Sequence, residues 1–184
     1  MRKLKHHEQK LLKKVDFLHW KTEDDTRETA LLRRYHIQKR EDYVAYNRVS
    51  GLITKLTAKL ATLPQTSAVR IRTTEALLAR LFSMGLIDTA SSLIKAAALP
   101  ATAFARRRLP VVMVRLRMAE TLKAAVTFVE QGQVRVGPET VNDPAFIVTR
   151  SQEDFVTWVD SSKIKRAADK YNDKLDDYDL LEGA

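Results

Sequence analysis

The sequence RRRLPVVMVRLRMAETLKAAVTFVEQGQVRVGP, residues 106–138, decides the fold of this chain. Apolar residues at helical spacing predict a first helix near its start, where Pro110 suits the first turn because its missing N–H would lack a partner there anyway. The same spacing predicts a second helix over 119–130. Beyond it the hydrophobic period changes from that of a helix to that of a strand, so that Val134 and Val136 share one side.

Three segments rich in β-branched and aromatic residues follow, at 140–141, 146–148 and 155–158. Such residues favour strands. The segments between them have the composition of turns, and the second of these predicted turns covers 151–154. The whole stretch therefore predicts a small module of two helices followed by a small sheet.

The residues before this module predict helices at 26–34, 39–63 and 73–84. Gly85 follows the last of these helices, and it can take the left-handed conformation that commonly ends a helix. The segment 88–105 is rich in Ala, Ser and Thr, and its pattern predicts no definite structure. We treat it as the join between the two halves.

These patterns predict an α+β fold in three parts. A helical N-terminal region covers 1–105, and an αα-plus-small-β-sheet module covers 106–160. A short C-terminal helix and an acidic tail cover 161–184. The acidic tail is typical of a solvated, disordered segment, and a docking peptide for a basic partner is the alternative.

The charge balance indicates a polyanionic partner. The chain has 32 Lys and Arg against 23 Asp and Glu, a net charge of +9 and a pI ≈ 9.8, and a basic surface attracts phosphate whatever the fold. No apolar run reaches the roughly 20 residues that a membrane-spanning helix needs, and no signal-peptide pattern opens the chain. We expect a soluble protein that is not secreted, has no membrane partner and binds nucleic acid.

Signals for enzyme chemistry are weak. The adjacent residues His6 and His7 cannot share a helical face, and no acidic pair frames any histidine at metal-ligand spacing. The chain has no cysteine, its five glycines form no phosphate-binding loop, and no Gly-x-Ser-x-Gly motif occurs. We expect no catalytic residue, no metal, no cofactor and no small-molecule substrate.

Arginines are concentrated at both ends of the module's first predicted helix, at Arg106, Arg107, Arg108, Arg115 and Arg117. Their mutual repulsion, with no acid before Glu120, favours a bound polyanion. A planar guanidinium grips phosphate oxygens two at a time and stacks on bases. A basic face that serves only solubility is the alternative. DNA is less favoured because no recognition helix is visible.

A second basic region lies near the N-terminus. Its apolar residues Leu11, Leu12, Val15 and Leu18 fall at helical spacing and predict an amphipathic helix. The basic residues on and before this helix are candidates for additional RNA or partner contacts: Arg2, Lys3, Lys5, Lys10, Lys13 and Lys14. A solvated lysine face is the alternative.

The segment VEQGQVRVG at 129–137, together with RRL at 107–109 and VNDPAFIV at 141–148, resembles the S-four RNA-binding domain family. In that family the paired helices and the start of the hairpin form one RNA-facing surface. The resemblance implies RNA contacts by Arg107, Arg108, Arg117, Lys123, Gln131, Gln133 and Arg135. Many members carry His in place of Gln133.

The flanking segments extend the resemblance. The segments YHIQKRE at 35–41 and LLARLFSMGL at 77–86 resemble the helical region that precedes this domain in eukaryotic ribosomal relatives. The ends, at 2–18 and 154–165, are similar to a protein family of the U-three (U3) small nucleolar ribonucleoprotein.

This resemblance implies a nucleolar ribosome-biogenesis factor of the small-subunit processome, and not an enzyme. Such a factor would bind U-three snoRNA and pre-rRNA and promote the pairing of the snoRNA with pre-18S rRNA, which supports early cleavage. It would dock on other processome proteins, such as an Mpp-ten-like scaffold. A structural small-subunit ribosomal protein of the same family is the alternative. An RNA-modifying enzyme is disfavoured because the chain leaves no room for a catalytic domain.

Overall fold

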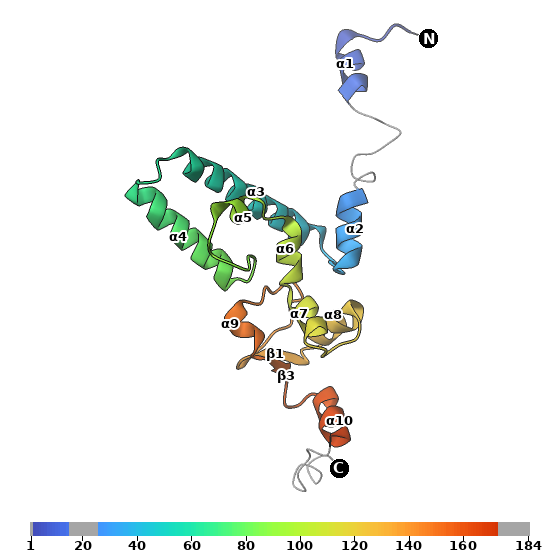
Figure 1. The fold of residues 1–184 in the computed structure, drawn as a ribbon. Helices are drawn as coiled ribbons and strands as arrows, with labels where there is room; N and C mark the ends of the chain where they lie inside the picture. Colours follow the sequence, from blue (N-terminus) through green and yellow to red (C-terminus); the bar gives the residue numbers. More distant parts are fainter. Residues whose placement is uncertain (1, 15–25, 173–184) are drawn as a thin grey trace.

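The computed structural model describes residues 2–14 and 26–172. The structure is mostly helical with a small antiparallel sheet in its C-terminal half, which confirms the predicted α+β fold (Figure 1). The elements in chain order are α1 (His6–Lys14), α2 (Thr26–Arg34), α3 (Arg40–Thr62), α4 (Ala68–Ser83), α5 (Leu93–Ala97), α6 (Ala101–Arg106), α7 (Leu109–Arg115), α8 (Leu122–Glu130), β1 (Val134–Val136), β2 (Glu139–Thr140), α9 (Arg150–Glu153), β3 (Val156–Trp158) and α10 (Lys163–Tyr171).

The module contains α7 and α8 packed on an antiparallel sheet of order β2-β1-β3. Strand β1 is central because it pairs with β2 on one side and β3 on the other. Its Val134 and Val136 are both buried in the core, as the period-two pattern predicts. The Phe128 ring meets the Trp158 ring edge-on, with 5.6 Å between centroids. The fully buried residues at the centre of this core are Leu109, Val112, Met113, Ala125, Val129, Val134 and Val148.

The N-terminal part contains two long helices, α3 and α4. Helix α5 packs on both of them, and α6 packs on α3. The short helices α5 and α6 are formed by the segment 88–105, for which the sequence predicts no definite structure. They are held by packing on α3, where the Tyr46 and Phe104 rings stack at 5.8 Å. The Ser50 hydroxyl also donates to the Leu99 carbonyl at 2.6 Å.

Backbone hydrogen bonds join the start of the module to one of its own predicted strands. The Leu109 N–H donates to the Phe146 carbonyl and the Val148 N–H donates to the Arg107 carbonyl, both at 2.9 Å. The prediction of a strand at 146–148 is therefore wrong in one respect: these residues form an isolated bridge with Arg108 and do not join the sheet. The bridge pairs one residue with one residue, so it is too short to count as a strand.

The predicted turn at 151–154 is also wrong for most of its length, because residues 151–153 belong to helix α9 and Asp154 is its C-cap. Thr149 and Gln152 form a capping box, in which each side chain binds the other's backbone, and this arrangement starts a helix. Helix α4 begins at Ala68, earlier than the predicted residue 73. Helix α8 begins after Thr121, whose hydroxyl accepts from the Ala124 N–H at 3.2 Å.

The predicted helices at 26–34 and 39–63 are confirmed to within a residue at each end. Helix α1 confirms part of the N-terminal amphipathic helix, while Val15 and Leu18 lie outside the described residues, as does the acidic tail from 173 onward. In the ranges 2–14 and 26–172, no helix is long and apolar enough to span a bilayer. The division into parts at 105/106 and 160/161 stays a prediction.

Gly85 supplies a stability test. Its φ of +71° is left-handed, and a Cβ there would stand 2.9 Å from Arg107 Cζ. We expect Gly85→Ala to lower the free energy of unfolding by about 1 to 3 kcal/mol, because a side chain is strained in this conformation and also meets the guanidinium. Urea denaturation measures the change.

Two glycines serve as controls for Gly85. Gly137 has a φ of +63°, and no atom lies within 4 Å of the place that a Cβ would take, so Gly137→Ala isolates the backbone cost. Gly51 lies inside α3 with open space around it, and Gly51→Ala should stabilise the protein by about 0.5 to 1 kcal/mol. Equal losses of stability for the variants at 85 and 137 would contradict a close approach to Arg107.

Candidate RNA-binding surface

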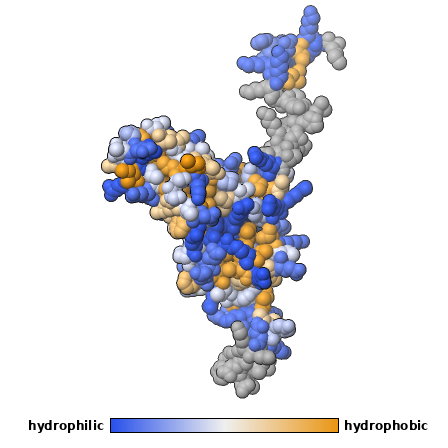
Figure 2. Space-filling view, in the orientation of Figure 1, coloured by the Kyte–Doolittle hydropathy of each residue, from blue (hydrophilic) through white to orange (hydrophobic). Residues whose placement is uncertain are grey.

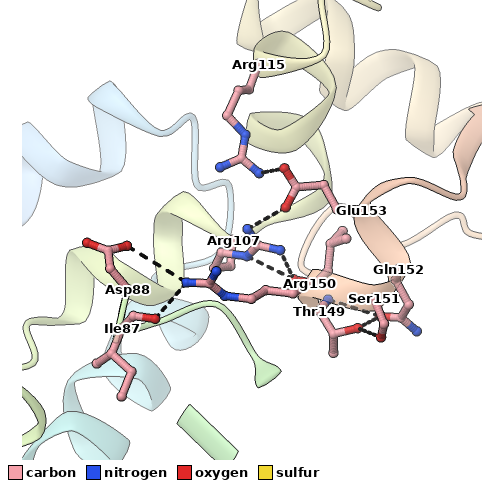
Figure 3. Close-up of polar contacts among 10 residues, drawn as sticks. Ile87, Asp88, Arg107, Arg115, Thr149, Arg150, Ser151, Gln152 and Glu153 are labelled. Atoms are coloured by element: carbon pink, nitrogen blue, oxygen red, sulfur yellow. Dashed lines mark hydrogen bonds and ion pairs between the residues drawn. The ribbon is translucent and has the colours of Figure 1, made fainter. Parts of the chain in front are cut away.

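The three consecutive arginines point to three different places. Arg107 is only 5% exposed. Its Nε and Nη2 donate to the Val148 carbonyl at 3.0 and 2.8 Å, and its Nη1 donates to Glu153 Oε2 at 2.9 Å (Figure 3). Protein acceptors therefore occupy both edges of this guanidinium.

Arg108 is 2% exposed and reaches into the N-terminal part. Its Nη1 donates to Asp42 Oδ2 at 3.0 Å and to the Tyr46 hydroxyl oxygen at 3.5 Å, and both partners lie on α3. Burial raises the pKa of Tyr46 above its ordinary value, although the nearby positive charge of Arg108 opposes this. Arg108 thus ties the module to α3.

Arg106 is the exposed member of the three. Its Nε donates to the Tyr35 hydroxyl oxygen at 3.3 Å. The Arg34 guanidinium lies 5.8 Å from the centroid of the same ring. The end of α2 and the end of α6 therefore place two cations beside one tyrosine.

RNA contact by Arg107 and Arg108 stays a prediction, and the burial of both side chains favours a structural role for them. No local pattern in the sequence could have revealed this. The acceptor Glu153 is 46 residues from Arg107, and Asp42 is 66 residues from Arg108. Spacing along a helix or strand carries no information about such partners.

Glu153 joins two of the predicted RNA contacts to each other. Its Oε2 accepts from Arg107 and its Oε1 accepts from Arg115, whose side chain is 51% exposed (Figure 3). Burial raises the pKa of Glu153, but the hydrogen bond from Arg107 and the charge of Arg115 outweigh it, so the pKa lies below its ordinary value. Arg115 keeps one side open to solvent while Glu153 holds the other.

Arg117 lies in the turn between α7 and α8, and Lys123 lies in the first turn of α8. Arg117 has a left-handed φ of 60°, which lets the chain turn back so that the Met118 N–H donates to the Met113 carbonyl at 2.9 Å. Both cationic side chains are exposed, and neither has an ion pair within the described ranges. These two residues are open to phosphate.

The remaining candidates lie at the end of α8 and on β1. Gln131 is exposed at the C-cap of α8, and Gln133 is half-buried with an Oε1 that accepts no hydrogen bond from the described residues. Arg135 donates from Nε to Thr157 Oγ1 at 3.2 Å and from Nη1 to Asp160 Oδ2 at 2.6 Å. Arg135 is thus partly neutralised by its own chain.

Asp160 is shared between two cations. Lys165 Nζ donates to Asp160 Oδ1 at 2.5 Å, while Arg135 binds the other oxygen. The hydrogen bond from Lys165, assisted by the charge of Arg135, holds the pKa of Asp160 below its ordinary value. The carboxylate therefore links β1 to the first turn of α10.

Arg150 is a residue that the sequence did not single out. Its Nη2 donates to the Ile87 carbonyl at 2.8 Å, and its guanidinium lies 4.3 Å from the centroid of the Phe82 ring. Arg150 therefore holds α9 against the end of α4, and Figure 3 shows its bond to Ile87, which follows that helix. The capping box at Thr149 and Gln152 could have predicted the helix, but not these partners.

The N-terminal candidates lie on α1 and just before it. Arg2 forms an ion pair with Glu8 at 2.7 Å. Exposed side chains belong to Lys3, Lys5, Lys10 and Lys13, and the side chain of Lys14 lies outside the described part. In the parts of the chain that the structure describes, no group of three or more His, Cys, Asp or Glu is placed to hold a metal ion.

Hydrophilic side chains gather around the start of the module in one view of the surface (Figure 2). Figure 2 shows them gathered where Figure 1 draws α6, α7 and α9. Among the candidates, Arg106, Arg115 and Arg117 are exposed and lie on α6, on α7 and just after α7. This arrangement can bind phosphate groups through cations that the fold leaves accessible.

Glu153 supplies a test of the charge network. Its folded-state pKa is lowered, so the carboxylate stabilises the fold above its unfolded pKa and loses this effect as the pH falls through the folded pKa. We expect Glu153→Gln to lower the free energy of unfolding by about 1 to 3 kcal/mol at neutral pH. The gap from the parent protein should close as the pH falls below about 4.

Urea denaturation over a pH series measures this gap. Glu139→Gln is the matched control, because Glu139 is exposed on β2 and takes part in no ion pair among the described residues. A gap for the Glu153 variant that does not change with pH would contradict the proposed charge network.

Two family models match the chain. The Ribosomal protein S4/S9 N-terminal domain matches residues 3–99, and the S4 domain matches residues 107–154. The second match contains α7, α8, the sheet's first two strands and α9. The S4 match begins at Arg107, the first of the two buried arginines.

Individual relatives match over nearly the full length. The chain is 55% identical to the U3 small nucleolar ribonucleoprotein protein IMP3 of Homo sapiens over 181 residues, 98% of either chain. It is 53% identical to the protein of the same name from Saccharomyces cerevisiae, over 98% of this chain and 99% of the other. The small ribosomal subunit protein uS4 of Hyperthermus butylicus is 25% identical over 78% of this chain and 80% of its own length. The chain therefore belongs to the IMP3 family of U3 small nucleolar ribonucleoprotein proteins.

Proposed function

We propose that this protein is an RNA-binding ribosome-biogenesis factor that binds U3 snoRNA and pre-18S rRNA and promotes their base pairing, and so supports early pre-rRNA cleavage. It would act in the nucleolus as part of the small-subunit processome. Other processome proteins, among them an Mpp-ten-like scaffold, would be its protein partners. We propose no catalytic role for it.

The observation that carries this proposal is the pair of exposed, unneutralised cations, Arg117 and Lys123, at the turn between α7 and α8 within the described residues. Two RNA strands repel each other through their phosphates. A surface that neutralises phosphates on both strands lowers this repulsion, and pairing then needs no reacting side chain.

The proposed RNA contacts are the candidates of the module whose side chains are exposed or half-buried. They are Arg106, Arg115, Arg117, Lys123, Gln131, Gln133 and Arg135, with the basic residues of the α1 region as additional RNA or partner contacts. Arg107 and Arg108 would act indirectly, because they hold α7 in position against α9 and α3. RNA phosphates would compete with Glu153 for Arg115 and with Asp160 for Arg135.

Neutralising the exposed pair tests the proposal. The double variant Arg117→Gln/Lys123→Gln should bind single-stranded fragments of the two RNAs more weakly. The slope of log K against log salt should fall by about 0.7 for each phosphate that the variant no longer neutralises. The variant should also slow annealing of complementary fragments, while its urea denaturation midpoint stays unchanged because both side chains are exposed.

A charge-matched control separates local contact from general attraction. The double variant Lys55→Gln/Lys59→Gln removes the same charge from the exposed face of α3. It should keep the parent protein's salt slope. Equal losses of affinity in the two double variants would contradict a specific surface at the α7–α8 turn.

The alternative, a structural small-subunit ribosomal protein, is favoured by the similarity to uS4 of Hyperthermus butylicus, although identity to that protein is lower. Sedimentation of cell extracts distinguishes the two roles. Confinement to large precursor particles supports the assembly role. Co-migration with mature small subunits would overturn it.

A further inference from the structure

Helix α3 carries an apolar stripe that the fold leaves uncovered. Val49, Leu52, Leu56 and Leu63 are 42%, 56%, 43% and 38% exposed. Their spacings of three, four and seven residues place Val49, Leu52 and Leu56 in one row along α3, with Leu63, the C-cap residue, at the end of the row. The row spans about 21 Å at ~1.5 Å per residue, which is close to four helical turns.

This stripe is separate from the face that α3 buries. The buried residues of α3 are Tyr46, Ser50, Ile53, Thr57 and Leu60, and they pack toward α4, α5 and α6. The exposed row lies beside that face. The apolar surface of α3 is therefore wider than the part that packs against the other helices of the protein. Figure 2 shows hydrophobic side chains at the surface over the region where Figure 1 draws α3 and α4.

The outer edge of the stripe is basic. Arg48, Lys55 and Lys59 are exposed and follow the row along α3 at spacings of seven and four residues. Within the described ranges none of the three has an ion pair. The acids of α3, Glu41 and Asp42, lie in its first turn, and Asp42 is bound to Arg108.

Single exposed apolar residues need no explanation, but a row of them bordered by charge is typical of a helix-docking surface. The positive charge beside the stripe limits which molecule can dock on it. Helix α1 has apolar residues, but it is itself basic through Lys10 and Lys13, and Lys5 lies just before it. A second copy packed symmetrically would place the same three cations against each other. RNA would neutralise the cations and leave the leucines in water.

The acidic residues 173–184 of this chain have a suitable composition. They follow α10, however, and Figure 1 places α10 at the opposite end of the molecule from α3. A separate chain is therefore favoured as the occupant.

We propose that the stripe of Val49, Leu52, Leu56 and Leu63 docks an amphipathic helix of another protein, with apolar residues at the same spacing and a row of Asp and Glu facing Arg48, Lys55 and Lys59. This surface shares no residue with the proposed RNA contacts. The docking proposal therefore does not depend on the proposed role in pairing U3 snoRNA with pre-rRNA.

Photocrosslinking in the full-length protein identifies the occupant. A benzoylphenylalanine placed at Leu52 should crosslink, in assembled particles, to a protein segment with apolar residues at helical spacing and acidic residues beside them. The control carries the same probe at Ala58, which is exposed on another side of α3, and it should not crosslink to this segment. A crosslink to RNA, to a second copy or to residues 173–184, or no crosslink, would overturn the proposal.

A synthetic peptide of the crosslinked segment then tests the charge pattern with the purified protein. Fluorescence anisotropy should show at least a tenfold loss of affinity for Lys55→Glu/Lys59→Glu and for Leu52→Asp, with circular dichroism unchanged in both. Replacing the peptide's acids with Lys should restore binding to the Lys55→Glu/Lys59→Glu variant. Arg117→Gln/Lys123→Gln should bind the peptide like the parent protein. Equal binding of the peptide by all variants would contradict docking on α3.

Discussion

The guanidinium groups of Arg107 and Arg108 are buried where the helical N-terminal part meets the module, and the contacts between the two parts depend on how these charges are paired. Arg107 binds the Val148 carbonyl and Glu153, and Arg108 binds Asp42. An unpaired charge in such a place costs several kcal/mol. The bridge between 107–109 and 146–148, the position of α9 and the position of α3 must all be correct for the pairs to form. Electrostatic pairing therefore specifies how the parts join.

The sequence predicts best where periodicity is long and uninterrupted. Helices α2 and α3 fall where apolar residues recur at helical spacing, and Gly85 has the left-handed φ that its place after a helix predicts. Helices α5 and α6 have no comparable signal, because each is about one or two turns long and is held by packing on α3. Tertiary contact decides such segments, and a single sequence does not display it.

The sequence predicts which cationic residues are candidates for RNA contact, but it does not predict which of them the folded protein leaves exposed. Composition and resemblance identify the arginines of the α6–α7 region, but the carboxylates that neutralise some of them come from distant parts of the chain. Arg107 and Arg108 are buried. Arg115 is paired with Glu153 and Arg135 with Asp160, while Arg117 and Lys123 have no ion pair within the described residues. A count of charges along the sequence therefore exceeds the charge that the folded protein offers to a polyanion.

Helix α9 is only four residues long, and a helix of that length is unstable alone because nucleation fixes several residues for very few hydrogen bonds. It persists because Arg150 binds the end of α4 on one side and Glu153 binds Arg107 and Arg115 on the other. If the contacts of Arg150 or those of Glu153 break, α9 is no longer stabilised as a helix, and the remaining contacts are lost with it. The N-terminal helices and the S4 module should consequently unfold in one transition, and a ligand that binds only the module would protect α4 against unfolding without touching it.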